Sequence, residues 1–445
     1  MNYVGTARPI HDAKGKATGY TKYAGDLSLP NMAYLCMLHS KIPHGYVKAV
    51  HAEKALALPG VYGVYHCLNT TDRKYNRYHS NFDQAYLPNE ECAFNDYVRF
   101  VGDKIGVVAA CDQETAERAA RLVEVEYEEL PFSIGFDDTL AGKNCLEGET
   151  PVRDEYTLEV GKKQESTEGL IEVCSTMELP RLHHATMETH ACIADYDPYI
   201  DMLTVYCPNQ AVHGIRTVLA DYLEMPESHV RVIKATMGGS FGAKQEWFLE
   251  PVAALVAKKL CCPVKLVYSR GEAMTDTIVR GAMRMSARGY YTPDGEMKEI
   301  YCDVTLDAGA YIGNAGDYIR ALAGKPTRCY RIPYMHYHGQ VISSNSPVSG
   351  AFRSWSAAEE ALMMERQIDA AAEKLGIDRL TIRLKNVAHA GEEDKKLHLS
   401  LEDIRIGDAI TLGSEKFGWD KLKAEDAAFN ASQQRYRRGV GIGIG

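Results

Sequence analysis

Residues 237–245, Met-Gly-Gly-Ser-Phe-Gly-Ala-Lys-Gln, are the stretch of this chain best suited to bind a ligand through its backbone. Glycine lets a backbone approach a ligand closely, and unpaired N–H groups bind anionic or oxygen-rich groups such as a phosphate or a metal oxo group. An alternating apolar run at residues 229–235 predicts a strand before the stretch, and apolar spacings of three and four residues from Phe248 to Leu260 predict a helix after it. We therefore expect a strand that runs into a glycine loop, and a loop that opens a helix.

Spacing excludes the two best-known phosphate loops at this stretch. A P-loop requires Gly, four residues, and then Gly-Lys-Ser/Thr, which Gly238, Gly242 and Lys244 do not supply. The pattern G-x-G-x-x-G is absent as well. The alternative to a ligand site is a tight turn from strand to helix that binds nothing.

Further segments elsewhere in the chain form an ordered set with the glycine loop. Pro208-Asn209-Gln210 precedes the loop, and Gly350-Ala351-Phe352-Arg353-Ser354-Trp355 follows it. The others lie in the first 131 residues: Asp-Ala-Lys-Gly-Lys-Ala-Thr-Gly at 12–19, Leu-Pro-Gly-Val at 58–61, Val-Gly-Asp-Lys at 101–104 and Glu-Leu-Pro at 129–131. In this order the motifs resemble the molybdenum-binding part of the xanthine dehydrogenase and aldehyde oxidase family of molybdenum hydroxylases, closest to its bacterial xanthine dehydrogenases.

The resemblance and the mixed strand and helix patterns predict an α+β fold. An N-terminal α/β hammerhead-type domain (1–135) and a connecting segment (136–168) are expected, followed by the first half of a molybdopterin-binding domain (169–432) and the start of its second half (433–445). Asp112 is expected to cap a helix to residue 122, followed by a strand at 123–128. Ser356 and Glu359 predict a capping box for a helix that ends at Gly376.

The resemblance implies roles for two of these motifs' side chains. In this family a molybdenum ion held by a pterin dithiolene oxidises the substrate, with water as the oxygen source. Gln210 is expected to donate its amide N–H to an oxo ligand, and Arg353 to stabilise the transition state with its planar guanidinium. No side chain is expected to bind the metal directly. The backbone N–H groups of Phe241 and Gly242 are expected to make the main contacts with the cofactor. The full set of expected cofactor-binding residues is Gln210, Gly239, Ser240, Phe241, Gly242 and Arg353.

Three further residues are expected to face the substrate. Trp355 stands where the family usually has a Phe or Tyr that stacks on a flat ring, and Arg320 lies near a substrate-binding arginine of purine enzymes. Gln245 stands where animal purine enzymes have a glutamate, and an amide can still donate to and accept from a heterocycle. Gln245 leaves purine hydroxylation open, and hydroxylation of a purine carbon is the activity expected from the resemblance. The alternatives are nicotinate, another N-heterocycle or an aldehyde as substrate, or a non-catalytic scaffold half that binds a partner chain but no cofactor.

The cofactor expected on this chain is molybdopterin, in its simple or its cytosine dinucleotide form. The twelve cysteines contain no C-x-x-C and no iron–sulfur spacing, so FAD and [2Fe-2S] clusters are expected on partner chains or domains. Residues 438–445 resemble the start of the second cofactor-binding half, which supplies a glutamate general base in the family. No residue of this chain fits that role, so we expect a fragment, or one part of a split molybdenum subunit as in nicotinate dehydrogenase-like enzymes, that is inactive alone.

Composition and charge exclude several other classes of protein. The 445 residues are 45% hydrophobic and 25% charged, which is typical of a globular protein of more than one domain. A net charge of −10 argues against a nucleic-acid or anionic-membrane surface. The chain has no long apolar run and no apolar segment near Met1, so we expect a cytoplasmic protein without a membrane span.

His183, His184, Glu188 and His190 lie close together in the sequence and raise the question of a zinc site. They lack the H-E-x-x-H spacing, and Met187-Glu188-Thr189 resembles a family segment near the cofactor. We therefore expect hydrogen-bonded polar residues here rather than metal ligands.

Overall fold

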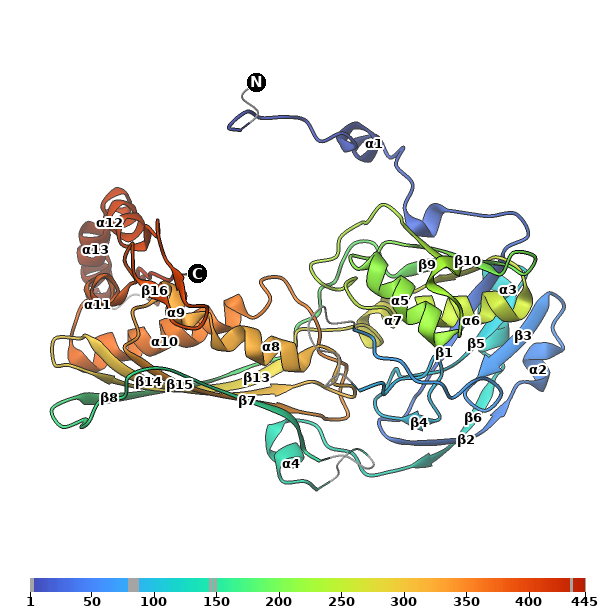
Figure 1. Cartoon of the computed structure of the whole chain (residues 1–445), viewed down its shortest axis with the longest axis horizontal. Helices are drawn as coiled ribbons and strands as arrows, with labels where there is room; N and C mark the ends of the chain where they lie inside the picture. The colour runs from blue at the N-terminus through green and yellow to red at the C-terminus, as the bar shows by residue number, and fades with distance from the viewer. Residues whose placement is uncertain (1–3, 79–87, 144–145, 147–149, 433–434, 445) are drawn as a thin grey trace.

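Two β-sheets lie side by side in the computed structural model of this chain, and helices pack on each of them (Figure 1). The structure describes residues 4–78, 88–143, 146, 150–432 and 435–444, so residues 1–3, 433, 434 and 445 of the expected terminal ranges lie outside it. Helices and strands are mixed along the chain, which confirms the predicted α+β class. None of the described helices has the length and apolar character needed to cross a membrane.

The larger sheet has seven strands in the order β11-β10-β9-β12-β1-β5-β3. β1 pairs in parallel with β12, Ala33 opposite Val264, so this sheet joins strands from both sides of the boundary expected near residue 135. Helices α5 (Val212–Tyr222) and α6 (Glu250–Leu260) pack on it with Ile215, Leu219 and Val252 buried in the core. The strands are β1 (Ala33–His39), β3 (Val61–His66), β5 (Lys104–Ala110), β9 (Ala191–Asp197), β10 (Met202–Cys207), β11 (Val230–Lys234) and β12 (Val264–Val267).

A small sheet, in the order β4-β2-β6, completes the N-terminal part. Asp112 accepts a hydrogen bond from the backbone N–H of Thr115 and caps α3, as predicted. The predicted acidic strand is also confirmed, because its glutamates face solvent while Val125 and Tyr127 are half-buried. The elements are β2 (Gly45–His51), β4 (Tyr97–Val98), β6 (Glu124–Glu129), α2 (Glu53–Leu56) and α3 (Gln113–Ala120).

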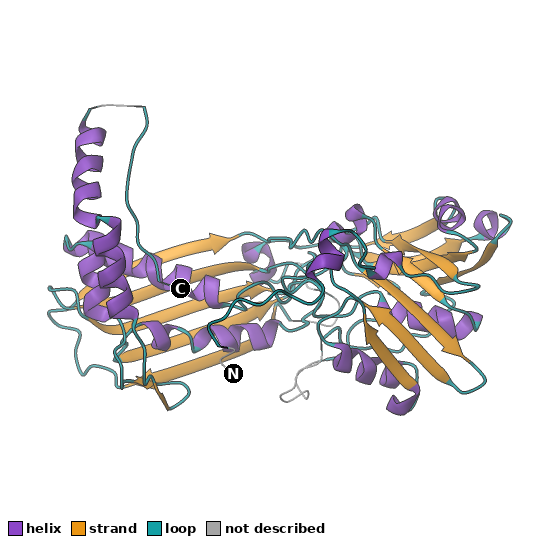
Figure 2. Ribbon diagram, turned by 90° about the horizontal axis from the view of Figure 1, so that it is seen from above, coloured by secondary structure: helices purple, strands orange, loops and turns teal. Residues whose placement is uncertain are grey.

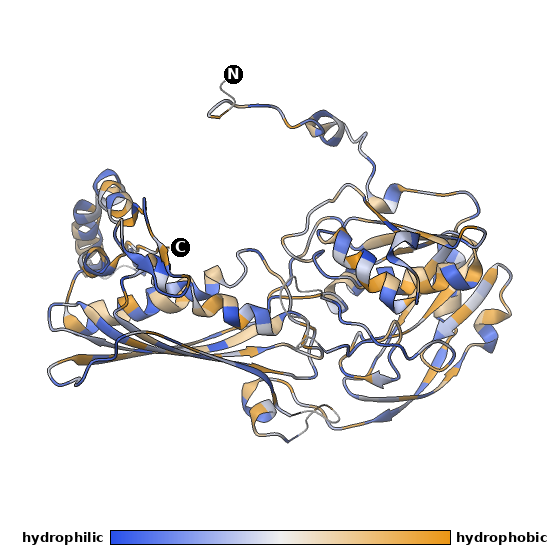
Figure 3. Cartoon of the chain, in the orientation of Figure 1, coloured by the Kyte–Doolittle hydropathy of each residue, from blue (hydrophilic) through white to orange (hydrophobic). Residues whose placement is uncertain are grey.

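The second large sheet has five strands in the order β7-β15-β14-β13-β8. Helices α8 (Ala315–Ala323) and α10 (Ala357–Leu375) cover one face of this sheet (Figure 1). Both hydrophilic and hydrophobic residues occur along its strands (Figure 3). Residues 136–168, expected to be a connection, contain α4 (Phe136–Leu140) and β7. The strands are β7 (Val152–Gly161), β8 (Ile171–Leu179), β13 (Ala282–Tyr291), β14 (Met297–Asp307) and β15 (Tyr334–Ile342).

The start of α10 differs from the prediction. The helix spans the expected residues and ends at Gly376 in the left-handed region, but Ser356 does not cap it. Ser356 has φ of 67°, its hydroxyl donates to the carbonyl of Trp355, and Glu359 binds Arg280 instead of the helix start. The predicted capping box is therefore wrong, because tertiary contacts engage both side chains.

The remaining elements are short or lie near the ends of the chain. Seen from above, the loops that connect the elements of the two large sheets meet between the sheets (Figure 2). The short and terminal elements are α1 (Ala13–Ala17), η1 (Ala24–Asp26), η3 (Glu227–His229), α7 (Arg270–Thr275), α9 (Pro326–Cys329), α11 (Arg379–Asn386), β16 (Glu393–Asp394), β17 (Leu399–Ser400), α12 (Ile406–Phe417) and α13 (Trp419–Ala431).

Candidate functional site

The glycine loop follows β11 as predicted, but it does not open the helix. α6 begins only at Glu250, and residues 241–244 form turns of their own. Gly239, Phe241 and Gly242 have φ of 105°, 54° and 105°, and left-handed residues interrupt helical hydrogen bonding. The expectation that the loop presents a helix N-terminus is therefore wrong.

Unpaired donors are nevertheless present in the loop itself. In the part of the chain that the structure describes, the backbone N–H groups of residues 239–242 have no hydrogen-bond acceptor. Phe241 is 53% exposed, Gly239 and Gly242 are half-buried, and Ser240 is buried. Successive free N–H groups in left-handed and turn conformations form a concave site for anionic or oxygen-rich groups.

Glu188 holds the two ends of the glycine loop. Its Oε2 accepts hydrogen bonds from the backbone N–H of Gly238, at 2.7 Å, and from Lys244 Nζ, at 2.6 Å. Lys244 is 1% exposed, and burial lowers its pKa although the Glu188 carboxylate opposes that shift. Lys244 thus positions the loop and is not available to a ligand in solvent.

The glycine loop contacts the loop that carries Arg353. A Cβ atom added at Gly242 would lie 2.2 Å from the carbonyl oxygen of Ala351. His184 Nε2 lies 2.8 Å from the same oxygen, and His190 Nε2 lies 2.9 Å from the carbonyl oxygen of Ala243. Two histidines of the supposed zinc cluster therefore hold the loops, and no group of three or more metal-binding side chains occurs among the described residues.

Gln210 lies beside the glycine loop. Its backbone N–H donates to the carbonyl of Lys244 at 2.7 Å, and its side-chain Oε1 accepts a hydrogen bond from the hydroxyl of Ser240. Because the oxygen is occupied by Ser240, the amide nitrogen of this exposed side chain is the group left to donate to a ligand.

Arg353 is exposed, and its guanidinium has no ion pair or hydrogen bond within the described residues. Its backbone is fixed, since Arg280 donates to the carbonyl of Arg353 at 2.8 Å and lies 4.3 Å from the ring centroid of Phe352. Ser354, Trp355 and Ser356 then have φ of 88°, 45° and 67° in succession. Such non-glycine conformations are strained, and they cluster at ligand sites.

The three expected substrate residues differ in their contacts. Gln245 is half-buried, and its side-chain amide has no partner among the described residues. Trp355 is half-buried against Tyr318, with ring centroids 5.3 Å apart. Arg320 forms a two-point ion pair with Asp154 of β7 and stacks on Tyr156, so a structural role accounts for its charge.

Sequence reasoning missed Glu246, which is buried directly after Gln245. Burial raises the pKa of Glu246 to about 8, although Arg77 and the backbone of Ala351 favour its charged form. Its Oε1 accepts a hydrogen bond from Asn314 Nδ2 at 2.8 Å. A single glutamate before Trp247 and Phe248 resembles the first turn of a helix, so no local pattern signals this buried environment.

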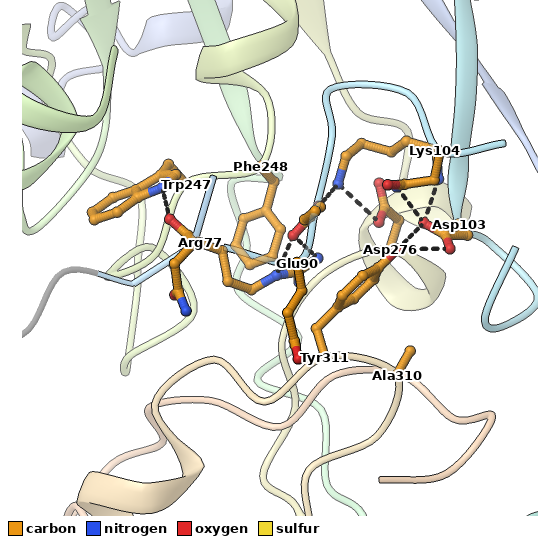
Figure 4. Close-up of polar contacts among 12 residues, drawn as sticks. Arg77, Glu90, Asp103, Lys104, Trp247, Phe248, Asp276, Ala310 and Tyr311 are labelled. Carbon is orange, nitrogen blue, oxygen red and sulfur yellow. Dashed lines mark hydrogen bonds and ion pairs between the residues drawn. The ribbon is translucent and has the colours of Figure 1, made fainter. Parts of the chain in front are cut away.

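A buried ionic cluster that contains Arg77, Glu91 and Lys104 lies next to Phe248 (Figure 4). Arg77 pairs with Glu91 and stacks on the rings of Phe248 and Tyr311, at 4.9 and 5.2 Å. Lys104 binds the same glutamate and lies 3.8 Å from Asp276. This cluster connects the N-terminal part of the chain to the segment that follows the glycine loop.

Family models and relatives match most of this chain. The model of the molybdopterin cofactor-binding domain matches residues 149–387, and the model of the aldehyde oxidase and xanthine dehydrogenase a/b hammerhead domain matches residues 18–131. The xanthine dehydrogenase molybdenum-binding subunit of Escherichia coli O157:H7 is 30% identical over 446 residues, 97% of this chain and 58% of that subunit. The nicotinate dehydrogenase large molybdopterin subunit of Eubacterium barkeri is 31% identical over 384 residues, 85% of this chain and 88% of that subunit.

A solved structure shares the fold. Quinoline 2-oxidoreductase from Pseudomonas putida 86 matches with a TM-score of 0.88 and 22% identity, over 96% of this chain and 56% of that one. The chain therefore spans little more than half the length of several proteins that it resembles, including the Escherichia coli subunit.

Proposed function

Because this chain belongs to the xanthine dehydrogenase and aldehyde oxidase family of molybdenum hydroxylases, we propose that it supplies one wall of a molybdopterin site that hydroxylates a purine carbon. The free N–H groups of residues 239–242 are the observation that carries this proposal. They lie beside the Gln210 amide, in a loop that contacts the loop of Arg353. Neutral donors and one unpaired cation suit an oxygen-rich, anionic cofactor.

The chain's own residues would act by binding and orienting. The bound molybdenum centre would supply the oxidation and the transfer of a water-derived oxygen. The N–H groups of Phe241 and Gly242 and the amide of Gln210 would donate hydrogen bonds to it. The Arg353 guanidinium would stabilise negative charge that develops on the substrate, and it needs no proton transfer because it is always charged.

Gln245 and Trp355 support a flat heterocycle as substrate. The unpaired amide of Gln245 can donate to and accept from ring nitrogen and carbonyl groups, and Trp355 offers an aromatic face. The Escherichia coli relative is named as a xanthine dehydrogenase subunit, which favours a purine such as xanthine or hypoxanthine.

Nicotinate is the second candidate, and one observation favours it. The nicotinate dehydrogenase large molybdopterin subunit of Eubacterium barkeri is 31% identical, and the likeness covers most of both chains, 85% of this one and 88% of that subunit. In either case the chain would work with the rest of a molybdenum subunit and with chains that carry FAD and [2Fe-2S] clusters, and it would be inactive alone.

The test is a substrate screen on the complete enzyme, purified with its natural partner chains. Xanthine, hypoxanthine, nicotinate and benzaldehyde are compared by reduction of an artificial electron acceptor. Preference for a purine supports the first candidate, preference for nicotinate the second, and preference for benzaldehyde contradicts both. Dye reduction by the isolated chain would contradict the need for partners.

A further inference from the structure

Glu246 connects three segments that form the candidate site. Its Oε1 accepts a hydrogen bond from Asn314, the residue that precedes α8, and its backbone carbonyl accepts one from Asn209 Nδ2 at 2.8 Å. Gly350 lies so close that an added Cβ would be 2.6 Å from Oε1. The carboxyl group therefore lies directly beneath the loop that carries Arg353.

Two atoms of the Glu246–Asn314 pair have no partner. Glu246 Oε2 and Asn314 Oδ1 are both buried, and neither has a hydrogen bond within the described residues. Both atoms are acceptors when Glu246 is ionised, and burying unpaired acceptors is unfavourable. A proton on Oε2 removes the problem, because an acid and an amide can form two hydrogen bonds in a ring: Nδ2–H to Oε1 and Oε2–H to Oδ1.

We propose that Glu246 is a positioning residue held as a neutral carboxylic acid, whose paired hydrogen bonds with Asn314 fix residues 350–353 and hence the place of the Arg353 guanidinium. The consequence for Arg353 rests on the proposed function. The acid–amide pair itself does not depend on it.

The charges around Glu246 agree with a neutral acid. Burial, together with the nearby charge of Glu91, raises the pKa of Glu246 to about 8. Arg77 and the backbone of Ala351 lower the pKa, but Arg77 is itself paired with Glu91 and the pKa stays at about 8. Near neutral pH the acid form therefore predominates, whereas well above pH 8 a buried carboxylate would face the Asn314 oxygen.

Infrared spectroscopy tests the acid directly, without cofactor or substrate. The chain is compared with Glu246→Gln in its complete enzyme, after ¹³C labelling of glutamate. The wild-type spectrum minus that of Glu246→Gln should contain an isotope-shifted carbonyl band of a protonated carboxylic acid at neutral pH, which is lost on titration with a midpoint near pH 8. The bands of Glu250 and Glu360, whose pKa values burial also raises, cancel in this difference. Identical spectra of the two proteins in this region would overturn the neutral acid.

Hydrogen exchange of the peptide that covers residues 346–356 tests the positioning role. Glu246→Gln keeps a donor and an acceptor towards Asn314, so its exchange should match the wild type, while Glu246→Ala should exchange at least about tenfold faster. Unchanged exchange in Glu246→Ala would overturn the role. If Glu246→Ala does not fold, Asn314→Leu is used, which removes both hydrogen-bonding groups that face Glu246 and should give the same acceleration. Molybdenum content of the wild type is measured separately, so an empty enzyme refutes the proposed function and leaves both tests of Glu246 intact.

Discussion

Gly242 lies against the backbone of Ala351, with only 2.2 Å between an added Cβ and the Ala351 carbonyl oxygen. These residues are 109 positions apart in the sequence, and one lies in the glycine loop while the other precedes Phe352 and Arg353. Their contact joins a loop of the seven-stranded sheet to a loop of the five-stranded sheet. The candidate site therefore depends on the two sheets keeping their relative position.

Gly242→Ala should separate these loops. The new methyl group meets backbone that cannot rotate away, and overpacking of this kind costs about 1–3 kcal/mol in addition to the strain of a positive φ. We expect a lower Tm and loss of bound molybdenum in the complete enzyme. Gly239→Ala is the matched control, because Gly239 has the same φ of 105° but its nearest contact would be 3.6 Å away. Equal loss of molybdenum in both variants would show that strain, and not the contact, decides cofactor binding.

Arg353→Ala should lower kcat/KM with little effect on stability. The guanidinium is exposed and unpaired in the described part of the chain, so its removal breaks no structural contact. Loss of a donor that stabilises developing charge costs about 10²–10³-fold in rate. Arg353→Lys keeps the charge but not the planar fork, and should lie between the wild type and Arg353→Ala.

Arg320→Ala is the contrasting variant for that experiment. Its guanidinium is held by Asp154, so we expect a lower Tm with a smaller loss of kcat/KM than in Arg353→Ala. Thermal melts and steady-state kinetics on the substrate found by the screen measure both effects. A larger loss of kcat/KM in Arg320→Ala than in Arg353→Ala would indicate that Arg320 binds the substrate.

His190 should make the fold sensitive to acid. Burial lowers the pKa of His184 and of His190 to about 4 from 6.5, and the Nδ1 atoms of both rings are buried without a hydrogen-bond partner among the residues that the structure describes. Between about pH 6.5 and 4 the unfolded chain therefore binds more protons than the folded chain at these sites. The stability that each neutral ring contributes is complete above pH 6.5 and is lost as pH falls towards 4, by about 1.4 kcal/mol per pH unit for each ring.

His190→Gln should flatten that dependence, because a neutral amide can still donate to Ala243. The pKa values of Asp103 and Glu246 are raised to about 6 and 8, and these groups make the folded chain less stable as pH rises, which opposes the effect of the histidines. The slope of Tm against pH is therefore compared between the wild type and each variant. The exposed His213→Gln should keep the wild-type slope. A wild-type slope in His190→Gln would contradict the conclusion that the neutral His190 ring makes the fold sensitive to acid.

Glu91→Gln should destabilise the protein strongly. Glu91 is the carboxylate that pairs with both Arg77 and Lys104, and all three side chains are at most 2% exposed. Removing one member of a buried ion pair costs about 3–5 kcal/mol, since the remaining charge is left without its partner. Tm measures the loss, with Lys48→Met in an exposed ion pair as the control that should change little. Equal Tm values for both variants would argue against a structural role of the cluster.

The sequence contains the motifs of the site but not the contacts that assemble it. Glycine spacing, the family resemblance and the cap at Asp112 could be read directly, because they depend on local residues. The contacts of Glu246 with Asn314 and of Arg320 with Asp154 join residues far apart in the chain, and no local pattern encodes them. Ser356 shows the same limit, since its capping pattern is correct locally and is overridden by Lys325, which binds its hydroxyl.

The molybdenum and pterin content of the chain, purified with its natural partner chains from a molybdenum-replete host, tests the central claim most directly. We predict stoichiometric molybdenum in the wild-type complex, and loss of the molybdenum in Gly242→Ala. A stable complex that contains no molybdenum would contradict the claim and support a scaffold half that binds a partner chain but no cofactor.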